Sequence, residues 1–294
     1  MHQQEISKVQ ETITIQPKII RMKDIHLDPS VFKTFLTGTP LDYLLSSVGG
    51  IPKGVNYMVI GDPGVGKTTV VMNMLANICE KQPQTKALFI SAEMNEIDLS
   101  SYIKRFPKFG NIDILFIEPD IDEDTHWLET LNKVLDEGWD FVAIDSFSEL
   151  QIAIREENKL SGKSAETMLL SLIKKHNKGE NKSNINTTFL TIQQVTKAGH
   201  FVGSNRLKHI ITSMMELRLE SPKDIYSERF ITFSKHRRGE VGIRLFYEFG
   251  KQDGVIFDGA KLEREKRFRE ASRLDKSTGY SVSAKFDDVF GGER

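Results

Sequence analysis

The segment Gly61-Asp62-Pro63-Gly64-Val65-Gly66-Lys67-Thr68 constrains this chain more than any other feature. It matches G-x-x-x-x-G-K-[ST], the phosphate-binding loop pattern, at every fixed position. Gly64 and Gly66 let successive backbone N–H groups converge on a phosphate, because neither residue has a Cβ in the way. Lys67 supplies a cation for the β- and γ-phosphates, and the Thr68 hydroxyl can ligate Mg²⁺. The pattern therefore predicts a nucleotide site.

The residues on either side of this loop support the same prediction. Residues 55–60 are apolar and predict a buried strand that enters the loop. Apolar residues then recur at helical spacing from Val70 to Ile78, so a helix should begin at the loop and direct its N-terminus at the phosphates. We expect ATP and Mg²⁺ as cofactors, held by Gly61, Asp62, Pro63, Gly64, Val65, Gly66, Lys67, Thr68 and Thr69.

Apolar strands alternate with helical segments over the first two thirds of the chain. Strands are predicted at 55–60, 86–93, 112–117, 141–146 and 187–192, with helices between them. This alternation is typical of an α/β fold with a central, mostly parallel sheet flanked by helices. Three later strands, at 214–219, 229–233 and 243–249, are joined by hairpin-like turns and should extend the sheet with antiparallel C-terminal members.

The chain divides into three parts by composition. Residues 1–36 predict an N-terminal extension, either a strand of the same domain or an oligomerisation arm on a neighbour, and residues 37–260 predict one nucleotide-binding domain. Residues 261–294 predict a charged helix or linker followed by a flexible C-terminal tail. The tail carries acidic residues beside Phe286 and Phe290, so a docking peptide for a partner is the alternative to a plain mobile end.

Bulk composition narrows the setting of the protein. The net charge is −1, so any nucleic-acid surface must be local rather than global. Cys79 is the single cysteine, which excludes an internal disulfide or a cysteine-based zinc site. The N-terminus does not resemble a signal peptide and no apolar run reaches membrane-spanning length. We therefore expect a cytoplasmic protein that makes no contact with a membrane.

Two acidic residues and two glutamines lie at predicted strand ends, where ligands of parallel sheets collect. Asp145 follows four apolar residues and is expected, with Thr68, to hold the metal. The plainer role of Asp145 is to cap the next helix. Glu93 is the candidate that orients or deprotonates the attacking water, with a surface ion pair as its plainer role. Gln193 or Gln194 is the candidate sensor of the γ-phosphate, and the sequence does not choose between them.

Two polar segments are predicted to be loops that contact phosphates of a nucleic acid. The first covers residues 151–162 and the second covers residues 195–206. Cationic side chains in or beside them can pair with a phosphate backbone, although solvated surface charge is the alternative. The candidate nucleic-acid-binding residues are Arg155, Lys159, Lys163, Lys197, His200 and Arg206.

The run Lys235-His236-Arg237-Arg238-Gly239 is predicted to end an edge strand. By itself it is a solvated basic turn. If subunits assemble into a ring or a filament, Lys235 and Arg237 can reach the γ-phosphate of a neighbour and act as catalytic fingers.

Taken together, these motifs resemble the ATPase core of the RadA/Sms family, which has a RecA-like P-loop NTPase fold and is close to the DnaB-type helicases. The resemblance covers residues 37–257 and rests on several motifs besides the P-loop: residues 37–42, 49–54, 90–93, 144–146, 195–199, 203–209 and 235–239. It implies a hexameric ring or a helical assembly, ATP between subunits, and single-stranded DNA held by two central loops.

Departures from the family pattern are also present. One cysteine cannot build the family's four-cysteine zinc module, and the chain is expected to lack the protease-like domain. Asn205, Lys208 and Arg238 replace the arginine, glutamate and phenylalanine usual in the family, which puts the DNA contact and the finger geometry in question. A stripped-down core of this kind would suit a phage-encoded protein in a host cytoplasm.

Two hypotheses of different classes follow. The first is an enzyme, a single-stranded-DNA-dependent ATPase that acts as a helicase or translocase in DNA recombination or replication. The second is a nucleotide-gated assembly or loading factor that binds DNA and recruits a partner without unwinding by itself. Unwinding of a forked duplex by the protein alone would distinguish them.

Overall fold

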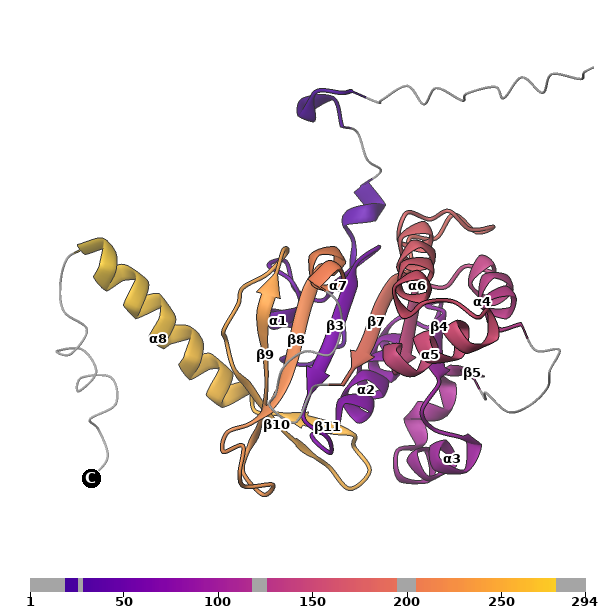
Figure 1. Cartoon of the computed structure of the whole chain (residues 1–294). Helices are drawn as coiled ribbons and strands as arrows, with labels where there is room; N and C mark the ends of the chain where they lie inside the picture. The colour runs from indigo at the N-terminus through magenta and orange to yellow at the C-terminus, as the bar shows by residue number, and fades with distance from the viewer. Residues whose placement is uncertain (1–18, 26–28, 118–125, 195–204, 279–294) are drawn as a thin grey trace, which may run out of the picture.

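A nine-stranded sheet forms the centre of the molecule (Figure 1). The computed structural model describes residues 19–25, 29–117, 126–194 and 205–278. Within them the strand order is β11-β10-β9-β8-β3-β7-β6-β4-β5. The strands span Asn56–Gly61 (β3), Ala87–Ser91 (β4), Asp113–Phe116 (β5), Phe141–Asp145 (β6), Thr188–Gln193 (β7), Ser213–Leu219 (β8), Arg229–His236 (β9), Leu245–Phe249 (β10) and Val255–Phe257 (β11).

The sheet has a parallel part and an antiparallel part, as the sequence predicts. Strands β8, β3, β7, β6, β4 and β5 are paired in parallel, whereas β9, β10 and β11 are added antiparallel to their neighbours. The expected α/β, RecA-like fold class is confirmed. One detail is wrong: the strand that carries Lys235 is not an edge strand, because β9 lies between β8 and β10.

Helices cover both faces of the sheet, and the alternation of side chains along the strands explains why. On β3, Tyr57 and Val59 belong to one apolar cluster, whereas Met58 and Ile60 belong to the other. The first cluster packs against α1 (Asp42–Leu45), α2 (Lys67–Lys81), α3 (Glu96–Arg105) and η3 (Pro107–Asn111). The second packs against α4 (Trp127–Asp136), α5 (Phe147–Glu157), α6 (Gly162–Asn177) and α7 (Asn205–Ile210).

The loop predicted for residues 151–162 is wrong over most of its length. Helix α5 continues to Glu157, and α6 begins at Gly162. The helix forms because Leu150, Ala153 and Ile154 recur at helical spacing and are buried against the sheet. Arg155 and Glu156, two of the polar residues that suggest a loop, are exposed to solvent on this helix, whereas Lys159 lies between the two helices.

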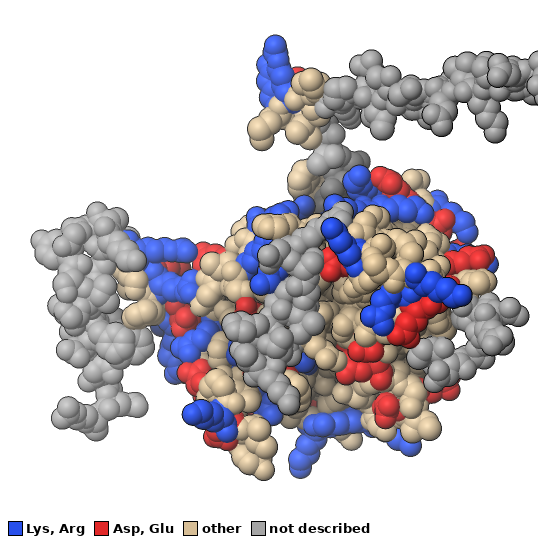
Figure 2. Space-filling view, in the orientation of Figure 1, with Lys and Arg blue, Asp and Glu red and all other residues tan. Residues whose placement is uncertain are grey.

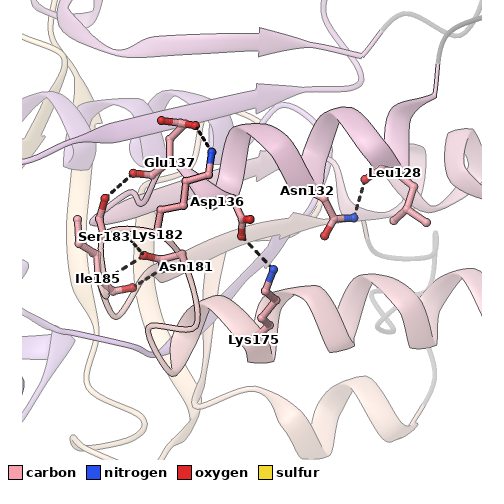
Figure 3. Close-up of polar contacts among 9 residues, drawn as sticks. All are labelled: Leu128, Asn132, Asp136, Glu137, Lys175, Asn181, Lys182, Ser183 and Ile185. Atoms are coloured by element: carbon pink, nitrogen blue, oxygen red, sulfur yellow. Dashed lines mark hydrogen bonds and ion pairs between the residues drawn. The ribbon is translucent and has the colours of Figure 1, made fainter.

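Polar contacts fix α4, α6 and the turn before β7 against one another at the amino edge of the sheet (Figure 3). Lys175 pairs with Asp136 at 2.9 Å, and Lys182 pairs with Glu137 at the same distance. The side-chain oxygen of Asn181 accepts from the backbone N–H groups of residues 183 and 185, which closes the turn on itself. These contacts set where β7 enters the sheet.

The two ends of the described chain leave the body in different ways. At the amino end η1 (Met22–Asp24) and η2 (Pro29–Phe32) precede β1 (Thr34–Phe35), which pairs with β2 (Ile51–Pro52). At the carboxyl end α8 (Gly259–Thr278) begins against the core through Leu262 and then extends away from it (Figure 1). The charged segment after residue 260 thus begins as a helix. None of the described helices is long and apolar enough to cross a membrane.

Candidate nucleotide-binding site

The phosphate loop connects β3 to α2, as the motif predicts. Gly64 and Gly66 have φ angles of 76° and 95°, a region that L side chains rarely adopt. Gly66 has a second constraint, because a Cβ there would lie 2.1 Å from Cζ of Phe249. The Lys67 ammonium donates to the carbonyl oxygens of Gly61 and Asp62, at 3.0 and 3.1 Å. Glycine and lysine therefore occupy the positions that a phosphate cradle needs.

The loop opens into a cavity of about 520 Å³ at the carboxyl end of the parallel strands. A nucleotide of drug-like size fits a space of this order. The residues that line it are Gly61, Pro63, Gly64, Gly66, Lys67, Thr68, Thr69, Glu93, Tyr102, Arg105, Asp145, Ile192, Gln194, Arg229 and Phe249.

Asp145 and Thr68 meet at the floor of this cavity. The Thr68 hydroxyl donates to Oδ2 of Asp145 at 2.5 Å, and the carboxylate is 3% exposed. The pKa of Asp145 is raised to about 6: burial raises it most, the Thr68 hydrogen bond and Lys67 lower it, and the nearby Glu93 also raises it. Burial also lowers the pKa of Lys67, which is opposed by Asp145, Glu93 and Asp62. A hydroxyl and a carboxylate side by side are the oxygen ligands that Mg²⁺ prefers.

Glu93 follows β4 and lies at the same cavity as Lys67 and Asp145. Glu93 is exposed to solvent at this cavity. The two glutamines differ in placement. Gln193 is 2% exposed within β7, opposite Ile60, whereas Gln194 is exposed and lines the cavity. The structure therefore brings Gln194, rather than Gln193, to the cavity itself.

Five cavity residues are not among the site residues predicted from the sequence, and one of them, Ile192, lies near the end of β7. Tyr102 and Arg105 come from α3, while Arg229 and Phe249 come from β9 and β10. The Arg229 guanidinium stacks 5.4 Å from the Phe249 ring centroid. The neighbouring Tyr247 hydroxyl donates to the carbonyl of Val65 in the phosphate loop at 2.9 Å. The antiparallel strands therefore form a wall of the nucleotide cavity.

Lys235 and Arg237 lie near the amino ends of the parallel strands, whereas the cavity lies at their carboxyl ends. Met214 on β8 is opposite both Lys235 on β9 and Met58 on β3, three residues before Gly61. The arrowheads of β3 and β9 accordingly point to opposite edges (Figure 1). The Lys235 ammonium donates to the carbonyl of Lys208, and Arg237 donates to that of His209 at 2.7 Å. Burial, and then the charge of Arg237, lower the pKa of Lys235.

The candidate nucleic-acid residues fall into two groups. Arg155 is in the last turn of α5 and pairs with Glu156 at 2.8 Å, while Lys159 and Lys163 are exposed in and after the short connection to α6. Acidic and basic side chains are interspersed over this region (Figure 2). Lys197 and His200 lie outside the described residues, and Arg206 lies in the first turn of α7.

Comparison with known proteins agrees with this geometry. The family model for the KaiC ATPase matches residues 35–114, which include the phosphate loop. The DNA repair protein RadA of Streptococcus pyogenes is 24% identical over 245 residues, and that of Helicobacter pylori is 24% identical over 229 residues. These alignments cover 80% and 77% of this chain.

Over most of its length, the chain is therefore similar to RadA proteins. It spans about half the length of the curated RadA proteins it matches, 47% and 46% in the two cases. Solved structures give the same fold: a KaiC-like protein of Pyrococcus horikoshii OT3 aligns with a TM-score of 0.59 and 19% identity, over 77% of this chain and 99% of that one. The flagellar accessory protein FlaH of Methanocaldococcus jannaschii aligns with a TM-score of 0.53 and 12% identity, over 71% and 92%.

Proposed function

We propose that this chain is a cytoplasmic, Mg²⁺- and single-stranded-DNA-dependent ATPase that works as a helicase or translocase in DNA recombination or replication. We further propose that it assembles as a ring, with six subunits as the first expectation, or as a filament. ATP is bound between subunits. The observation that supports assembly is the position of Lys235 and Arg237. They lie near the amino ends of the parallel strands, whereas the chain's own phosphate loop lies at the carboxyl ends.

Each catalytic role is assigned to a residue by its chemistry. Residues 61–69 cradle the phosphates, and Lys67 neutralises charge on the β- and γ-phosphates. Thr68 and Asp145 would hold Mg²⁺, which when bound neutralises charge on the β- and γ-phosphates. Glu93 orients or deprotonates the attacking water, and Gln194 takes the sensor role because it faces the cavity.

A neighbouring subunit supplies the last cations that surround the γ-phosphate. Charge accumulates on the transferred phosphoryl group in the transition state, and a cation at that position is worth a factor of about 10³ to 10⁵ in rate. Lys235 and Arg237 are held on carbonyl oxygens at a surface that cannot reach the cavity of the same chain. A neighbouring subunit can bring these two cations to the open side of the cavity.

Single-stranded DNA is the proposed activator because the curated relatives that align over most of the chain are named DNA repair proteins. Residues 197, 200 and 206 are the first candidates for its contacts, and Arg155, Lys159 and Lys163 are the second. The C-terminal tail is proposed to dock a replication or recombination partner.

Steady-state ATP hydrolysis with and without single-stranded DNA tests the proposal. Lys67→Ala and Lys235→Ala should each abolish the DNA-stimulated rate. An equimolar mixture should restore part of it, because a Lys67→Ala subunit still supplies a finger to an intact site. Hydrolysis that ignores DNA, with Lys235→Ala fully active, would favour the nucleotide-gated assembly factor instead.

A further inference from the structure

A β-bulge interrupts β9 immediately before Lys235. Met215 on β8 is opposite Phe233, but the preceding residue, Met214, is opposite Lys235. Ser234 is therefore an extra residue on β9, and the alternation of side chains shifts by one position there. Ile231 and Phe233 face the apolar cluster that contains α1 and α2. Without the bulge, period-2 alternation would direct Lys235 to the same face.

With the bulge, His236 takes the inward position instead. Its ring lies 4.7 Å from the Phe233 ring and 5.6 Å from the Tyr57 ring, between centroids. Nδ1 accepts from the backbone N–H of Arg238 at 3.2 Å and lies 2.9 Å from the Ser213 hydroxyl. The other nitrogen must then carry the proton.

That nitrogen, Nε2, lies 3.1 Å from the carbonyl oxygens of both Leu44 and Leu45 at the end of α1. It donates to them, so His236 is neutral and links β9 to β8 and α1 together. Burial lowers the pKa of His236, which agrees with the neutral form.

The residues on either side of His236 face the opposite way. Lys235 and Arg237 donate to the carbonyls of Lys208 and His209 at the end of α7, and α7 packs on the second apolar cluster. We propose that the bulge and His236 together aim the two cations, and that His236 is a positioning residue for catalysis in the neighbouring subunit. This inference rests on the function proposed above.

The test measures ATP hydrolysis of His236→Ala alone and mixed with Lys67→Ala, beside the same two measurements for Lys235→Ala. A misplaced finger costs rate rather than substrate binding, so kcat should fall at least about tenfold with KM within about twofold. In a random equimolar mixture of His236→Ala and Lys67→Ala subunits, about a quarter of the sites combine an intact phosphate loop with a well-placed finger from the neighbour. Part of the activity should therefore return, as in the mixture of Lys235→Ala and Lys67→Ala. His126→Ala, an exposed histidine, is the matched control and should change nothing.

Ser213→Ala keeps the ring packing and removes one partner of Nδ1, so it tests the same idea if His236→Ala does not fold; its kcat should fall several-fold. Unchanged kcat in His236→Ala or, where that variant does not fold, in Ser213→Ala would overturn the inference. So would a folded His236→Ala that is inactive and unrescued in a mixture where Lys235→Ala is rescued. If Lys235→Ala is not rescued either, the proposed function fails, and the inference fails with it.

Discussion

The hydroxyl of Thr68 and the carboxylate of Asp145 are joined by a hydrogen bond of 2.5 Å, which ties the first turn of α2 to the carboxyl end of β6. The two residues come from separate motifs, 77 positions apart. Their juxtaposition places a hydroxyl and a carboxylate at the floor of the cavity. The pair is therefore the first target for mutation.

Asp145→Asn should lower kcat for ATP hydrolysis by a factor of about 10² or more, because an amide replaces the carboxylate charge that would hold the metal. The affinity for a fluorescent ATP analogue, measured without added Mg²⁺, should change little. Thr68→Ser keeps the hydroxyl and should retain most of the rate. Asp113→Asn, an exposed carboxylate on β5, is the matched control. Equal rates for Asp145→Asn and Asp113→Asn would contradict a role for Asp145 in hydrolysis.

Gly66→Ala should be more destabilising than Gly64→Ala, although both glycines have positive φ. The backbone strain of about 1–2 kcal/mol applies to both. A Cβ at Gly64 meets nothing within 4 Å, whereas one at Gly66 would lie 2.1 Å from the Phe249 ring. That overlap should add about 1–3 kcal/mol to the loss in free energy of unfolding.

Thermal and urea unfolding of the two variants measure this difference. Phe249→Ala in the Gly66→Ala background removes the overlap and should recover part of the loss, leaving the strain behind. Two glycine variants of equal stability would mean that Phe249 does not pack on the loop.

The sequence is sufficient to predict the phosphate loop and the sheet because both are encoded locally. A glycine pattern and runs of apolar residues determine which segments become loop, strand and helix. Asp145 and Glu93 were found for a related reason, since a carboxylate at the end of a parallel strand lies where ligands collect. Local pattern does not state which strands pair, so β9 was placed at the edge of the sheet although it lies inside it.

The cavity wall could not be predicted in the same way. Arg229 and Phe249 line the cavity only because β8 and β10 align with β9 in one particular register. No motif marks such residues, and each is an ordinary strand residue by itself. The bulge at Ser234 is invisible for the same reason, since it exists only as a mismatch between two strands.

Two buried histidines should make a contribution to stability that falls as the pH drops below about 6.5, because both resist protonation in the folded state. The raised pKa of Asp145, about 6, contributes in the opposite direction at lower pH. Burial lowers the pKa of His176 and of His236 in the folded protein. The unfolded chain therefore binds more protons between the folded and the unfolded pKa values, which favours unfolding in that window. The contribution is fully present above the unfolded pKa and is lost as the pH falls through the folded values.

His176→Leu separates the two contributions. Neither ring nitrogen of His176 has a hydrogen-bond partner among the described residues, and the side chain is 0% exposed. Replacing it with an apolar side chain should cost little or be stabilising at pH 7.5, and it should flatten the loss of unfolding free energy between pH 7 and pH 5. Urea unfolding across this range measures the slope. An unchanged slope would mean that His176 protonates freely in the folded state.

Helix α5 provides the last test, because the sequence suggested a loop where the helix lies. Leu150 is 0% exposed in the second apolar cluster, whereas Ile152, two positions later, is 37% exposed. Leu150→Ala should cost about 2–5 kcal/mol of unfolding free energy through lost burial and a cavity. Ile152→Ala should change stability by no more than about 0.5 kcal/mol, since the Ile152 side chain is exposed at the surface of the helix. A polar loop would make the two substitutions equivalent, so similar losses in urea unfolding would contradict the helical packing. The same helix follows Asp145 after a single residue, Ser146, and so helps to hold Asp145 at the cavity.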